Sequence, residues 1–131
     1  MARERKTKIN DEFWPTNDDV KLFTILYPMI RSDLNEVREL SKKKQDEPLN
    51  QFKVKIINKK LEKAKTILRN EPTNEFLDLL DEETMPTNSD AVLQISQFIN
   101  AMNGFREKYY ESDGSELGLE DGEKYEWKTE D

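Results

Sequence analysis

Cysteine and histidine are both missing from this chain of 131 residues. Without cysteine there is no disulfide framework, which fits a reducing, intracellular compartment, and we expect a cytoplasmic protein. The two absences also remove the thiol nucleophile, the serine–histidine and cysteine–histidine pairs, and the usual zinc ligands. A metal site would need carboxylates and carbonyls, which suit Mg²⁺ or Ca²⁺. The composition therefore predicts a protein that is not an enzyme and has no cofactor or metal.

Long apolar segments are missing as well. The longest nearly apolar run, LFTILYPMI at 22–30, has 9 residues, whereas a membrane-spanning helix needs about 20. The beginning of the chain, MARERKTKIN, has no apolar core, so we expect no signal peptide. The sequence therefore predicts no association with a membrane.

Glycine, proline and alternating apolar residues are too scarce to favour a β-rich fold. Four glycines and five prolines interrupt the chain, and no run alternates in the way that predicts a pair of strands. Charged residues make up 37% and apolar residues 34%, so few side chains are available for the core. Amphipathic helices suit such a composition, because each needs only one apolar stripe. We therefore predict an all-α fold.

The tripeptide Pro-Thr-Asn occurs three times, at 15–17, 72–74 and 86–88. Threonine and asparagine are favoured helix N-caps, and a preceding proline keeps an earlier helix from continuing. Thr16 and Thr87 are each followed at the third position by an aspartate, as in a capping box. The copies are unevenly spaced, so we interpret them as three helix starts rather than as a binding motif presented three times.

Apolar periodicity predicts three long helices and one short helix, which cover residues 18–45, 48–69, 73–81 and 88–110. Pro28 lies inside the first helix, where we expect a kink, with a clean break as the alternative. Gly104 lies inside the last helix and resembles a C-cap. Phe105 and Tyr109 nevertheless keep the apolar period, which favours a helix that continues through the glycine.

Short connections predict a small antiparallel bundle at 13–110, because sequential helices then pack against each other. Residues 1–12 are predicted to form a flexible basic N-terminus. The net charge is −7, and residues 111–131 hold nine acids and two lysines, so the rest of the chain is neutral. Three of the four glycines also lie there, and we predict a disordered acidic C-terminal tail at 111–131.

The helix at 18–45 carries more apolar residues than one stripe needs. Its main stripe includes Val20 and Phe23, and three further residues lie off that stripe: Leu22, Ile25 and Met29. A helix that is apolar on two sides lies in the middle of a bundle or under a partner. These three residues are therefore a predicted binding surface for another protein or for a second copy of the chain.

The acidic tail contains apolar residues that a purely solubilising tail does not need: Leu117, Leu119, Tyr125 and Trp127. Acidic segments with sparse apolar anchors can bind a partner as a linear motif. The alternative is a tail that only keeps the protein soluble.

The helix at 48–69 is rich in bases. It carries seven of them against Glu62 as the one acid between 53 and 69: Lys53, Lys55, Lys59, Lys60, Lys63, Lys65 and Arg69. They form a candidate anion-binding surface, although solvated lysines that cover the edge of the core are the preferred interpretation. The same helix has a broad predicted apolar face, which includes Phe52 and Ile56. The acidic tail is predicted to lie loosely over this helix and over the lysines at 42–44.

The leading hypothesis is a non-enzymatic helical adaptor or regulatory protein that binds a protein partner through the helix at 18–45 and the tail. The alternative is a nucleic-acid-binding accessory protein that uses the bases of the helix at 48–69. A Mg²⁺-dependent enzyme built on Asp81, Glu82 and Glu83 is a weaker third hypothesis, because no second cluster of carboxylates accompanies them.

Overall fold

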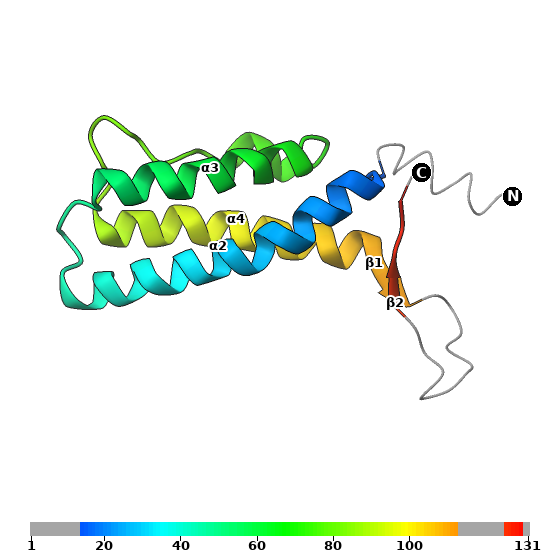
Figure 1. Ribbon diagram of the computed structural model, residues 1–131, viewed down its shortest axis with the longest axis horizontal. Helices are drawn as coiled ribbons and strands as arrows, with labels where there is room; N and C mark the ends of the chain where they lie inside the picture. Colours follow the sequence, from blue (N-terminus) through cyan, green and yellow to red (C-terminus); the bar gives the residue numbers. More distant parts are fainter. Residues whose placement is uncertain (1–13, 113–124, 130–131) are drawn as a thin grey trace, which may run out of the picture.

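The computed structural model describes residues 14–112 and 125–129 of the chain (Figure 1). Its elements are α2 (Asn17–Lys43), α3 (Gln51–Ile67), the 3₁₀-helix η1 (Pro72–Phe76), α4 (Asn88–Tyr109), β1 (Tyr110–Ser112) and β2 (Tyr125–Trp127). The described residues are mostly helical and form a helical bundle, as predicted. The two short strands were not predicted.

Two of the three Pro-Thr-Asn copies start α-helices, and the middle copy starts a 3₁₀-helix. Thr16 and Asp19 form a complete capping box at the start of α2, with the Asp19 N–H donating to Thr16 Oγ1 at 3.1 Å. At the start of α4 the Asp90 N–H donates to Thr87 Oγ1 at the same distance, 3.1 Å. In the middle copy Pro72 opens η1, which has no side-chain cap. These two helix starts were therefore predictable, because each cap residue lies three positions from its partner. Helix α3 begins at Gln51 after the cap Asn50, so the predicted start at residue 48 is wrong.

Helix α2 continues through Pro28, so a clean break at this proline is wrong. Figure 1 shows the N-terminal part of α2 inclined to the rest of the helix, as expected when proline removes an amide donor and crowds the preceding turn. Helix α4 likewise continues through Gly104, as the apolar period of Phe105 and Tyr109 predicted.

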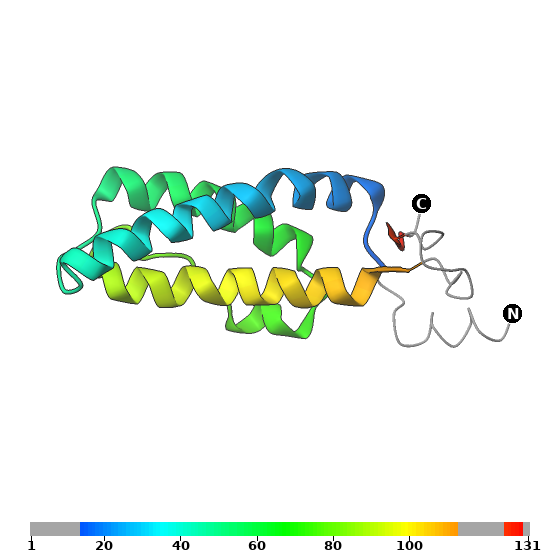
Figure 2. The same ribbon diagram turned by 90° about the horizontal axis from the view of Figure 1, so that it is seen from below.

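Helix α2 runs antiparallel to both α3 and α4, and these two run in the same direction (Figures 1 and 2). Tyr27 of α2 donates a hydrogen bond to Asn103 near the end of α4. The starts of α3 and α4 lie together, where the Leu49 N–H donates to the Pro86 carbonyl at 2.8 Å. The segment between α3 and α4 must therefore return along the whole bundle.

The predicted helix at 73–81 is wrong beyond Phe76, because residues 77–81 contain no helix. The Asn58 side chain accepts the Leu80 N–H at 2.9 Å and donates to the Leu80 carbonyl at 2.9 Å. Lys65 Nζ donates to the carbonyls of Asn74 and Leu77, which a longer helix would use internally. Side chains of α3 thus hold this segment, which takes the place of a fourth helix and buries Leu77 and Leu80.

The core consists of apolar side chains from α2, α3, α4 and the 77–80 segment. Ile30, Leu61, Ile95 and Phe98 are almost completely buried at its centre. On α3 the buried stripe steps through Val54, Ile57, Leu61, Ala64 and Leu68, which alternates steps of three and four residues. Burial of each valine, isoleucine or leucine of this stripe stabilises the fold by about 1.5–3 kcal/mol relative to exposure.

The prediction of a disordered tail from residue 111 onward is wrong for residues 111–112 and 125–129. Strand β2 pairs antiparallel with β1, and Trp127 lies opposite Tyr110. The Trp127 ring packs 5.1 Å from Phe23 and 5.9 Å from Phe105, measured between ring centroids. The contact of Trp127 with Phe23 and Phe105, which lie far away in the sequence, holds β2 in place beside β1. Leu117 and Leu119 lie outside the described residues, as do the residues of the predicted flexible N-terminus at 1–12.

Candidate protein-binding surface

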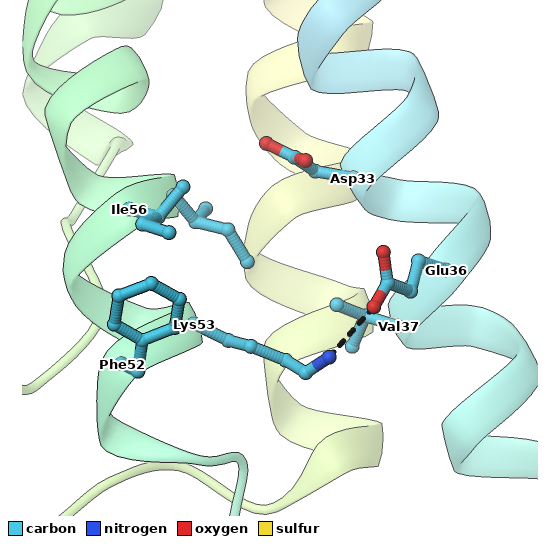
Figure 3. A pocket seen from close by; sticks show the side chains of 7 residues that line it. Asp33, Glu36, Val37, Phe52, Lys53 and Ile56 are labelled. Carbon is cyan, nitrogen blue, oxygen red and sulfur yellow. Dashed lines mark hydrogen bonds and ion pairs between the residues drawn. The ribbon is translucent and has the colours of Figure 1, made fainter.

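A groove of about 240 Å³ separates α2 from α3 (Figure 3). Helix α4 lies behind both helices in this view. Seven side chains line the groove: Asp33, Glu36, Val37, Phe52, Lys53, Ile56 and Ile57. The α3 side is mostly apolar and the α2 side carries the two carboxylates, so the walls differ in character.

Two ion pairs join α2 to α3 beside the groove. Lys53 Nζ lies 2.7 Å from Glu36 Oε2 and spans the groove, as Figure 3 shows. Lys60 Nζ lies 2.8 Å from Asp33 Oδ2, and both of these side chains are largely buried, with 16% and 20% of their area exposed. The first pair is solvent-exposed and contributes about 0.2–1 kcal/mol at most. Both carboxylates of the groove therefore have a positive partner from α3.

The predicted binding residues on α2 do not line this groove, but they lie on the same side of the helix as its two carboxylates. Leu22, Ile25 and Met29 precede Asp33 and Glu36 at steps of three or four residues, which keeps all five on one side of the helix. Ile25 is 59% exposed and Met29 is 45% exposed, whereas Leu22 is half-buried against the core. The exposed apolar residues of this set are consequently Ile25 and Met29.

The predicted apolar face of α3 is wrong at Phe52 and Ile56. Phe52 is 70% exposed and Ile56 is also exposed, because both lie off the stripe that Val54, Ile57 and Leu61 direct into the core. The sequence carries this signal, since residue 52 is two positions from 54 and falls on the opposite side of a helix. Two large apolar side chains exposed one turn apart beside a groove are typical of a binding surface.

The seven bases of α3 do not form one patch. Four of them make bonds within the molecule: Lys53, Lys60, Lys65 and Arg69. The other three, Lys55, Lys59 and Lys63, are exposed, and none of them has an ion pair within the part of the chain that the structure describes. They follow each other at one-turn intervals on the outer side of α3, together with Phe52 and Ile56. We call these five residues the outer face of α3.

Arg69 forms an ion pair within the fold. Its guanidinium contacts both carboxylate oxygens of Asp19, at 2.9 Å and 3.0 Å, and so joins the end of α3 to the start of α2. Burial alone raises the pKa of Asp19, but hydrogen bonds from Arg69 and Thr16 outweigh it and hold the pKa below the ordinary value of 3.8. A bound anion would have to compete with this pair.

Trp127 is not exposed as expected of a free linear motif, because it packs against the helical bundle. Trp127 is half-buried and packs against Phe23, Phe105 and Tyr110. Strand β2 lies at the end of the bundle opposite to the turn with the lysines at 42–44 (Figure 1), so residues 125–127 do not cover that turn. Tyr125 lies in β2. The predicted cover by the rest of the tail concerns residues outside the described ranges.

A second exposed phenylalanine lies elsewhere on the molecule. Phe76 of η1 is 69% exposed and borders a hollow of about 450 Å³ between η1 and α4. The other side chains that line this hollow are uncharged: Thr73, Leu77, Gln97, Asn100 and Ala101. This hollow therefore lacks the charged row that accompanies Phe52.

The carboxylates at 81–83 have local structural roles. Asp81 accepts hydrogen bonds from the N–H groups of Glu83 and Thr84, and these bonds lower the pKa of its carboxyl. Glu82 accepts a hydrogen bond from the Asn58 amide at 3.0 Å. Within the described ranges, no group of three or more acids is placed to hold a metal ion.

Comparison of the chain with protein-family models, curated proteins and solved structures finds no match. No helix in the described ranges is both long enough and apolar enough to span a membrane.

Proposed function

We propose that this protein is a non-enzymatic adaptor or regulatory protein that binds another protein across α2 and α3. The observation that carries the proposal is the set of large apolar side chains exposed on this side: Ile25, Met29, Phe52 and Ile56. Exposed apolar side chains gathered beside a groove favour association with a second apolar surface. A phenylalanine at such a place supplies a large contact area for a partner.

Photo-crosslinking tests this proposal with a matched control inside the same chain. Phe52 and Phe76 are the same residue type with nearly equal exposure, 70% and 69%. Photoreactive benzoylphenylalanine replaces one or the other in the full chain in cells. We expect a discrete adduct with another protein from position 52 and none from position 76. Equal adducts from both positions, or none from position 52, contradict the proposal.

Nucleic-acid binding is the second candidate function, and the row of Lys55, Lys59 and Lys63 favours it. Three phosphate contacts would give a slope of about −2.7 for log affinity against log salt with duplex DNA. The row has only three bases, and phenylalanine and isoleucine lie among them, which supports a protein partner instead. Titration of a mixed-sequence duplex at low salt tests this candidate, since the triple Lys→Gln variant would abolish the slope.

A further inference from the structure

The outer face of α3 combines two apolar side chains with a row of bases. Phe52 and Ile56 lie one turn apart beside the groove, and Lys55, Lys59 and Lys63 follow at the same spacing. From residue 52 to residue 63 the helix rises about 16 Å, or three turns. The face therefore matches the length of a short helical segment.

The α2 and α3 sides of the groove differ in the charges that have no ion-pair partner in the described part of the chain. Asp33 and Glu36 on the α2 wall are paired with lysines of α3. The three lysines of the row have no ion pair in the part of the chain that the structure describes, and Glu62 is the one acid of α3 next to them. The surplus on the α3 side is positive, so a complementary partner is acidic there.

The apolar side chains determine what kind of acidic partner fits. A groove between two helices binds an amphipathic helix, which inserts apolar side chains spaced three or four residues apart. Phe52 and Ile56 on the α3 side of the groove offer apolar contact to such a helix, and Ile25 and Met29 offer further exposed apolar contact along α2. Acidic residues on one flank of the partner would meet the lysine row at one-turn intervals.

We propose that the surface formed by Ile25, Met29 and the outer face of α3 binds an acidic amphipathic helix of a partner protein. The inference rests on the proposed function and names the partner's chemistry. The partner helix lies along the groove, with its apolar side chains over Phe52 and Ile56 and its acidic flank over Lys55, Lys59 and Lys63. A polyanion without apolar anchors would leave the apolar walls uncovered, which favours a helix over a nucleic acid.

Three designed peptides test the proposal against the full chain. The first is an amphipathic helix with leucines at helical spacing and glutamates on one flank. The second has lysines in place of the glutamates, and the third has serines in place of the leucines. We expect saturable binding of the first, with amide shifts in α2 and α3, and at least about tenfold weaker binding of the other two.

Variants of the full chain complete the test. Replacing Lys55, Lys59 and Lys63 by glutamate should make the chain bind the basic peptide more tightly than the acidic one. Phe52→Ser should lower the affinity for the acidic peptide at least about fivefold. Circular dichroism checks that each variant keeps its helix content. Lys→Gln at the three positions serves as a second variant, which should remove the preference without reversing it.

Several outcomes overturn the inference, and they can be told apart. Equal binding of the acidic and basic peptides contradicts the acidic partner but leaves protein binding at this face intact. No binding of any peptide at about 0.2 mM, despite an adduct from position 52, overturns the helical partner alone. If position 52 also gives no adduct, the proposed function fails too. Duplex binding that the lysine variants abolish, or self-association that Phe52→Ser abolishes, assigns the face to nucleic acid or to a second copy.

Discussion

The two sides of α3 carry the same kinds of residue and use them in different ways. On the inner side Asn58 and Lys65 bond to the backbone of the returning segment, and Leu61 is completely buried. On the outer side Lys59 and Phe52 are exposed to solvent. The difference teaches that the residue type alone does not separate structural from binding residues, whereas the position around the helix does.

Leucine and isoleucine substitutions should give the largest contrast between the two sides. Leu61→Ala should lower the free energy of unfolding by about 3 kcal/mol, because it leaves a cavity in a closed core. Ile56→Ala on the outer side should cost less than about 1 kcal/mol, since its side chain is already exposed. Chemical denaturation measures both, and equal costs would contradict the assignment of the two sides.

Asn58→Ala should have the next largest effect. The substitution leaves the buried N–H and carbonyl of Leu80 without their partner, which costs about 2–3 kcal/mol. Hydrogen exchange should show faster exchange at Leu80 in this variant. A cost below about 0.5 kcal/mol would mean that Asn58 does not hold the returning segment.

Asp19→Asn should cost about 1–2 kcal/mol near neutral pH, because it weakens the capping-box bond that the Asp19 side chain accepts from the Thr16 N–H and removes the ion pair with Arg69. Because the folded-state pKa of Asp19 lies below 3.8, the carboxylate's contribution is complete above about pH 5. It is lost as the pH falls below about 4 and through the folded-state pKa. Unfolding measured from pH 7 to pH 2.5 should show the wild-type advantage shrinking, and a constant difference would contradict this account.

Two lysine substitutions give the smallest and most selective contrast. Lys65→Met removes the donor that serves the carbonyls of Asn74 and Leu77, and should cost about 1 kcal/mol. Lys59→Met on the outer side should change the stability by less than about 0.5 kcal/mol. Thermal unfolding of the two variants in parallel checks the difference, and a greater loss from Lys59→Met would refute it.

Local signals predicted much of the fold. The caps of Thr16 and Thr87 lie within three residues of their partners, and the long helices follow from the apolar period. The returning segment was not predictable in this way, because the Asn58 side chain bonds to a backbone 22 residues away. The position of Trp127 likewise depends on Phe23 and Phe105, which no local pattern connects to it.

The candidate site was predicted in part. Ile25 and Met29 were identified from their position off the main stripe of α2, and both are exposed. Phe52 and Ile56 were assigned to the core because apolar residues were counted without a strict helical angle. Which lysines remain exposed could not be predicted, since the choice depends on the acids of α2 that face α3.

The most direct test separates folding from binding on the outer face of α3. Photoreactive benzoylphenylalanine is placed at Met29, on α2, in the native chain and in a chain with five substitutions to glutamine: Phe52→Gln, Lys55→Gln, Ile56→Gln, Lys59→Gln and Lys63→Gln. The thermal midpoint of the substituted chain should lie within about 5 °C of that of the chain without the five substitutions, because these side chains are exposed. The adduct with the partner protein should be lost. An adduct that persists in a folded chain, or a chain that no longer folds, would contradict it.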